Sequence, residues 1–154
     1  MYAVLIMGIV MLRTSCKEQR QDMKIVYYHK GEETTLNPKL SDFSELIKAT
    51  ENLLVTADDM LRLAVDSELI KKIKEEESAT EVIFPRPIEF IVNYNKNIIH
   101  PNRILIPLSR DFVEEGENPT AVIFLGYPDY SSGPYTNHKG FEELNKILKD
   151  MGIK

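Results

Sequence analysis

The stretch TEVIFPRPIEFIVN, residues 80–93, decides the fold class of this chain. Its apolar residues fall at alternate positions, the pattern of a half-buried β-strand, and this face carries Val82, Phe84, Ile88, Phe90 and Val92. Pro85 and Pro87 interrupt the pattern, and proline cannot donate a hydrogen bond to a neighbouring strand. We therefore expect the segment either to lie at a sheet edge or to split into two strands.

Further strands are predicted on both sides of this segment. After a turn around residues 94–97, the apolar runs 103–107 and 120–125 are expected to continue the sheet as a meander. Towards the N-terminus, residues 24–29 are rich in β-branched and aromatic side chains. They end at the Lys-Gly pair 30–31, which predicts a strand followed by a turn.

Three segments show the apolar period of amphipathic helices. The clearest is 42–57, and a second helix over 68–77 follows the helix-capping residue Asp66. The third covers 141–151, whereas residues 60–65 fit either a helix or a short buried strand, of which we favour the strand. The sequence therefore predicts an α+β fold, with an antiparallel or mixed sheet and helices packed on one face.

The composition is that of one globular domain. The chain has 154 residues, of which 43% are hydrophobic and 28% charged. Its net charge of −5, with acids and bases interspersed, argues against a nucleic-acid partner, which needs a clustered positive surface. The single cysteine excludes an internal disulfide and a multi-cysteine metal site, so stability has to come from packing.

The first sixteen residues, MYAVLIMGIVMLRTSC, are the most apolar stretch of the chain. The run 2–12 is shorter than the roughly 20 residues that a transmembrane helix needs. Two interpretations remain open: a buried strand of the domain, or the apolar region of a secretory signal, which spans about 7–15 residues.

This N-terminus resembles a bacterial lipoprotein precursor, in which an apolar segment ends in small residues, here Thr14 and Ser15, and the following cysteine is lipidated. The resemblance covers only the first sixteen residues. It implies that Cys16 is the lipid attachment site. The chain then divides into a signal-peptide-like segment, a polar tether and a single globular domain, at residues 1–15, 16–22 and 23–154.

The same resemblance implies an exported protein. Its lipid would anchor it to a membrane, on the outer side of the cytoplasmic membrane or at the outer membrane. If the apolar stretch is instead a buried strand, the protein is expected in the cytoplasm.

The sequence contains no recognisable catalytic or cofactor signature. His29, His100 and His138 are far apart and lack the spacing that places two metal ligands on one helix face. The glycines are scattered and form no phosphate-binding loop, and the serine pair 131–132 lacks the pattern of a nucleophilic serine turn. We therefore expect no metal and no cofactor.

The segment GYPDYSSGPYTNHKG, residues 126–140, is the strongest candidate for a functional site. It follows a predicted strand, precedes a predicted helix and concentrates side chains suited to binding, namely Tyr127, Asp129, Tyr130, Tyr135 and His138. Loops on a rigid scaffold often carry binding groups, and tyrosine offers a large face with a polar tip. The alternative is a structural loop whose tyrosines cover the sheet edge.

Two functions stay open. The favoured one is a non-catalytic lipoprotein of the cell envelope that binds a protein or an envelope component through its loops or its sheet edge. The alternative is a small hydrolase-like enzyme that uses Asp129, Tyr135 and His138 for acid–base chemistry. These three side chains should converge in one pocket if the enzyme hypothesis holds.

Overall fold

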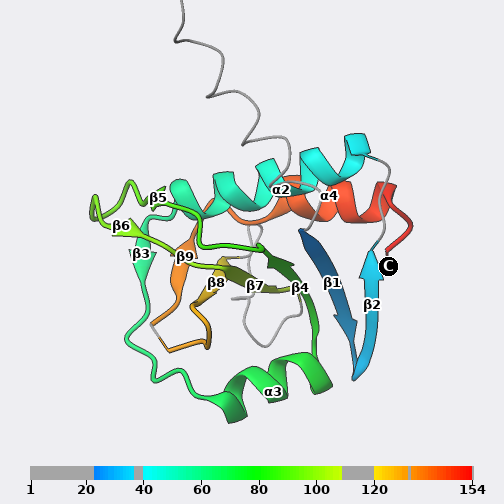
Figure 1. Ribbon diagram of the computed structural model, residues 1–154, viewed down its shortest axis with the longest axis horizontal. Coiled ribbons are helices and arrows are strands. Elements are labelled where there is room, and N and C mark those ends of the chain that lie inside the picture. Colours follow the sequence, from blue (N-terminus) through cyan, green and yellow to red (C-terminus); the bar gives the residue numbers. More distant parts are fainter. Residues whose placement is uncertain (1–22, 37–39, 109–119, 132, 154) are drawn as a thin grey trace, which may run out of the picture.

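The computed structural model describes residues 23–36, 40–108, 120–131 and 133–153 (Figure 1). This part of the chain forms a seven-stranded sheet, a two-stranded hairpin and three helices. The large sheet has the order β2-β1-β4-β7-β8-β9-β3, and each neighbouring pair is antiparallel. Its strands are β1 (Lys24–His29), β2 (Glu32–Leu36), β3 (Asp59–Met60), β4 (Ser78–Ile83), β7 (Arg103–Pro107), β8 (Ala121–Gly126) and β9 (Tyr135–Asn137).

The segment 80–93 splits at its two prolines. Strand β4 ends at Ile83, and the chain forms strand again only in β5 (Phe90–Ile91), which pairs with β6 (Ile98–Ile99) as a separate hairpin. Of the two predicted alternatives, the split into two strands is confirmed, and β4 itself lies between β1 and β7 in the middle of the sheet. The prolines come after β4 and leave its hydrogen-bond ladder intact.

The predicted meander is present with one insertion. Strands β4, β7, β8 and β9 are neighbours in chain order, and the β5–β6 hairpin is inserted between β4 and β7. The five residues of the alternating face all belong to one apolar core or pack against it, as their shared parity predicted.

The α+β class is confirmed, but the helices lie on both faces of the sheet (Figure 1). Helices α2 (Leu40–Val55) and α4 (Glu142–Asp150) lie side by side and cover one face, whose strand residues include Val82 and Ile104. Helix α3 (Ser67–Glu76) covers the opposite face, where Ile70 and Ile73 belong to the same apolar cluster as Leu105 and Phe124. The central strands are apolar on both faces, so one helical layer could not bury them.

Local signals explain several element boundaries. The carboxylate of Asp66 accepts a hydrogen bond from the backbone N–H of Leu69 and caps α3, as predicted. Lys30 and Gly31, with φ values of 49° and 84°, form the two-residue turn that joins β1 to β2. Of the strand favoured over 60–65, only Met60 is in a strand.

The N-terminal predictions lie outside the described residues, which begin at Met23. Cys16, the segment 1–15 and the tether 16–22 all fall there. Within the described part of the chain, no helix combines the length and the apolar character needed to cross a lipid bilayer.

Candidate functional site

A buried glutamate lies on the α3 face of the sheet. Glu81 of β4 is paired with Val26 of β1 on one side and with Leu105 of β7 on the other, and its side chain is only 1% exposed. A buried carboxylate without partners costs folding free energy. Buried carboxylates are therefore found where hydrogen-bond donors surround them. The register brings such donors within reach, because Tyr28 and Arg103 lie two residues along β1 and β7 on the same face.

Three side chains donate hydrogen bonds to this carboxylate. The hydroxyl of Tyr28 and the ammonium of Lys74, on α3, both donate to Oε2 at 2.7 Å, and the hydroxyl of Tyr130 donates to Oε1 at 2.7 Å. Nη1 of Arg103 lies 4.0 Å from Oε1, and the Lys74 ammonium also lies over the Tyr28 ring. We call these five residues the Glu81 cluster.

The cluster keeps Glu81 ionised. Burial alone would raise the pKa of its carboxyl, but the hydrogen bonds from Lys74, Tyr130 and Tyr28 outweigh burial and lower the pKa. The pKa values of both tyrosines are raised, chiefly by burial and further by the neighbouring Glu81 carboxylate. At neutral pH both hydroxyls therefore remain protonated donors, and their rings are held in fixed positions.

An open cavity of about 650 Å³ lies above this cluster, between α3 and the sheet. Lys74, Arg103, Tyr28 and Tyr130 form part of its wall, and further lining residues come from the β1–β2 hairpin, from α3 and from the loop after β8: Gly31, Glu33, Ser67, Ile70, Lys71, Glu75 and Asp129. The volume falls within the range of small-molecule sites. The cavity therefore combines a suitable size with charged groups and two fixed aromatic rings.

Gly126 is the direct partner of Arg103 on β8, and it leaves space for the Arg103 side chain at the cavity wall. A Cβ atom on Gly126 would lie 2.7 Å from Cγ of Arg103, so the arginine stem passes where a side chain would be. The Arg103 side chain is 31% exposed, and its guanidinium makes no hydrogen bond to another described residue. It can therefore donate hydrogen bonds to a molecule in the cavity.

The structure brings two of the predicted loop residues to this cavity. Asp129 lines it, and Tyr130 belongs to the Glu81 cluster and is 8% exposed. Tyr127 lies in the same turn but is 63% exposed and does not line the cavity.

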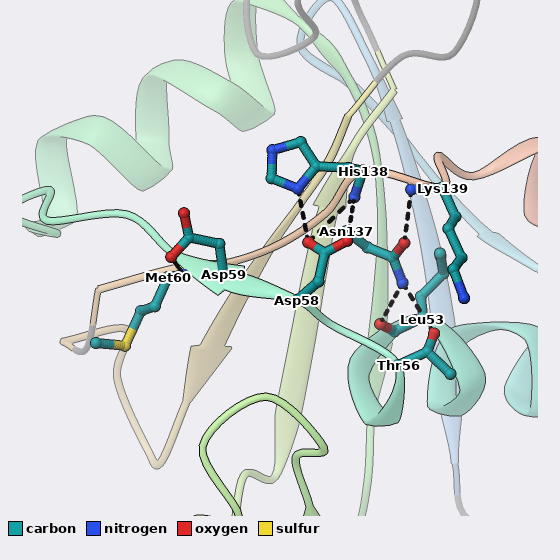
Figure 2. Close-up of polar contacts among 8 residues, drawn as sticks. All are labelled: Leu53, Thr56, Asp58, Asp59, Met60, Asn137, His138 and Lys139. Atoms are coloured by element: carbon teal, nitrogen blue, oxygen red, sulfur yellow. Dashed lines mark hydrogen bonds and ion pairs between the residues drawn. The ribbon is translucent and has the colours of Figure 1, made fainter.

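The other two predicted residues lie elsewhere. Tyr135 on β9 is buried in the core beneath α2 and α4. His138 follows β9 and contacts Asp58, which lies after α2 (Figure 2). Asp129, Tyr135 and His138 therefore do not meet in one pocket of the described chain.

The contacts of His138 join the end of β9 to the segment after α2. Its backbone N–H and Nδ1 both approach the Asp58 carboxylate, with Nδ1 at 2.7 Å from Oδ1 (Figure 2). Beside it, the Asn137 side chain donates to the carbonyl of Leu53 and to the hydroxyl of Thr56. These contacts give His138 and Asn137 a structural role at this junction.

Sequence reasoning missed most of the Glu81 cluster. Glu81 has the parity opposite to Val82, and that parity was expected to face solvent. Lys74 stands among charged helix residues that usually form a solvated face. The available signal was that Ala79 and Ile83, the two residues of this strand that share the parity of Glu81, are both apolar.

Comparisons with known proteins return no relatives: no protein-family model, no curated protein and no solved structure matches this chain. In the part of the chain that the structure describes, no group of three or more His, Cys, Asp or Glu residues is arranged to hold a metal ion. The function therefore has to be argued from the cavity and from the N-terminal sequence.

Proposed function

We propose that this chain is a membrane-tethered lipoprotein whose folded domain binds a small molecule of the cell envelope without chemically changing it. The observation that carries the binding part is the cavity beside α3, whose tyrosine and lysine walls are fixed by the buried Glu81. The tether rests on the resemblance of residues 1–16 to lipoprotein precursors.

Preorganisation supports this site as a binding site. Tyr28, Tyr130 and Lys74 are held by hydrogen bonds before any ligand arrives, so binding does not have to order them. Their rings and stems give apolar contact area, while the charged groups at the wall provide specificity. A rigid wall of this kind suits recognition of one small molecule.

Binding is favoured over the hydrolase alternative because the three residues of that alternative are separated. Asp129 lines the cavity, but Tyr135 is in the opposite core and His138 is engaged with Asp58. General acid–base catalysis needs its groups within hydrogen-bond reach of one substrate. The separation of these side chains therefore supports a site that binds a ligand without converting it.

The tether is tested by the mass of the mature N-terminus, measured on protein from its native membrane. We expect a chain that begins at Cys16 and carries at least two acyl chains, because one chain gives only marginal membrane binding. The matched variant Cys16→Ser should keep its N-terminal segment and carry no lipid. An intact Met1 with a free Cys16 thiol in a soluble pool would contradict the proposal.

The binding site is tested with the small-molecule fraction of a cell-envelope extract, added to isotope-labelled protein and followed by NMR. Backbone signals of Lys71, Lys74 and Asp129 should shift, and those of α4 on the opposite face should not. Shifts that are absent, or confined to residues outside the cavity, would contradict this site.

A further inference from the structure

The charges that line the cavity are only partly paired with one another or with other described residues. Lys74 is engaged by Glu81 at 2.7 Å, and Lys71 lies 3.8 Å from Glu75, one turn along α3. The remaining charged lining groups are the Arg103 guanidinium and the carboxylates of Glu33 and Asp129. None of these three groups forms a hydrogen bond or a close ion pair with another described residue, apart from the 4.0 Å approach of Arg103 to Glu81.

These remaining charges are of both signs and are separated along the cavity. Glu33 is on β2 and Arg103 on β7, which are three strand spacings apart in the order β2-β1-β4-β7. The register places Glu33 level with Pro107, four residues along β7 from Arg103. At about 4.8 Å for each strand spacing and about 3.3 Å for each residue along the strand, the backbones of Glu33 and Arg103 are roughly 20 Å apart. A ligand that touches both groups therefore needs opposite charges at its two ends.

Each end matches a definite chemistry. The planar guanidinium of Arg103 donates paired hydrogen bonds to a carboxylate or phosphate, and Lys74 beside it adds positive charge. Carboxylates such as Glu33 accept hydrogen bonds and attract ammonium groups. The rings of Tyr28 and Tyr130 lie between these ends, near Lys74 and Arg103.

We infer that the cavity binds a small zwitterionic molecule, with its anionic group at Arg103 and its ammonium group at Glu33. This inference deepens the proposed function and rests on the cavity being its ligand site. A simple anion would leave Glu33 without an opposite charge, and a simple cation would meet Arg103. A zwitterion satisfies both signs without changing the net charge of the site.

The test uses peptides as probes of charge separation. An extended peptide spans about 3.3–3.6 Å per residue, so glycine peptides of two to six residues cover separations up to roughly 20 Å. Calorimetric titration with the full chain in a non-ionic detergent should show saturable binding by one of them. The N-acetylated and C-terminally amidated forms of the same peptide should bind at least about tenfold more weakly, because each loses one charge-assisted contact.

Variants assign the two ends. Arg103→Gln should weaken the free peptide about tenfold or more and remove the penalty of amidation, whereas Glu33→Gln should remove the penalty of acetylation. Arg86→Gln and Glu142→Gln change exposed residues outside the cavity and should leave binding unchanged. Gly126→Ala keeps the guanidinium but displaces the Arg103 stem, so it should also weaken binding. Thermal unfolding of each variant separates lost binding from lost folding.

Two results would overturn the inference. Equal affinity for the free and N-acetylated peptides would show that the site reads only an anion. No saturable binding by any glycine peptide would show that charge separation of this kind is not recognised. In either case, NMR signals of cavity residues that still shift with the envelope extract would support the proposed binding of a small molecule. Failure of the zwitterion inference can therefore be distinguished from failure of the proposed function.

Discussion

The hydroxyl of Tyr130 donates a 2.7 Å hydrogen bond to Oε1 of Glu81, a residue 49 positions earlier in the chain. The bond joins the loop after β8 to the middle of the sheet and closes one side of the cavity. Both partners are buried, so water cannot replace a missing partner at low cost. Several measurable consequences depend on this contact and its neighbours.

Replacing Glu81 by Gln should destabilise the fold. The amide oxygen can accept some of the hydrogen bonds, but the Lys74 ammonium then has no opposite charge beside it. Loss of one partner from a buried charge pair costs about 3–5 kcal/mol, and the residual exposure of Lys74 should place the effect at or below the lower end. Urea unfolding measures it, with exposed Glu142→Gln as the control. An effect no larger than that of the control would show that the cluster contributes nothing to stability.

Stability should also depend on pH through Glu81. Because its pKa is lower in the folded chain than its ordinary value of 4.5, the folded state holds this carboxylate ionised more strongly than the unfolded state does. The stabilisation is complete above that ordinary pKa and is lost as the pH falls through the folded-state pKa. Unfolding free energies between pH 7 and pH 3 should therefore fall less steeply in Glu81→Gln than in the parent chain. Parallel curves would contradict the lowered pKa.

Two tyrosines of one turn should respond differently to loss of the hydroxyl. Tyr130→Phe removes a hydrogen bond to a buried charge and should cost about 1.5–3 kcal/mol. Tyr127→Phe changes an exposed side chain and should stay within about 0.5 kcal/mol of the parent. Chemical denaturation of the pair gives the comparison. Similar costs for both would mean that the Tyr130 hydroxyl has no structural role.

Gly133 should not tolerate a side chain. A Cβ atom there would lie 2.6 Å from the backbone carbonyl oxygen of Leu61, where the two segments are joined by the hydrogen bond from Leu61 to Pro134. Backbone cannot move aside as a flexible side chain can, so Gly133→Ala should cost about 1–3 kcal/mol. The neighbouring exposed Ser131→Ala is the control. Equal melting temperatures for the two variants would contradict the close approach.

The folded domain should not need the first sixteen residues. The six polar residues 17–22 offer no apolar periodicity that would bury them against the domain. A chain that starts at Lys17 should unfold cooperatively, with the same midpoint in urea as the full chain. A molten or insoluble product would instead support the interpretation of the apolar stretch as a buried strand.

Apolar periodicity predicted the larger helices and strands because their buried residues recur at a regular spacing along the chain. Strands β1, β7 and β8 and all three helices of the described chain lie within a few residues of the predicted segments. Strand β2 was not predicted, since its sequence EETTL is polar and its position depends on pairing with β1. Strand β9 was hidden in a loop rich in Gly and Pro, and has only three residues.

The candidate site was predictable only in part for a related reason. The loop composition pointed to Asp129 and Tyr130, and both lie at the cavity. Glu81 and Arg103 became functional candidates only through the register of β4 against its neighbours, which no local pattern encodes. Helices cover both faces because the central strands are apolar on both. The alternating pattern of residues 80–93 predicted only one of these apolar faces.

The two outermost strands of the sheet, β2 and β3, bear on whether copies of this chain can join edge to edge. Among the strands of the described chain, only β1 pairs with β2, and an unpaired strand edge can template aggregation when it is long and apolar. Here the exposed side chains of β2 include Glu32 and Glu33, so a second copy that docked on this edge would bring like charges together. The opposite edge, β3, has only two residues and offers little to template. At high concentration the domain should therefore resist edge-to-edge aggregation, because of the charge of β2 and the shortness of β3.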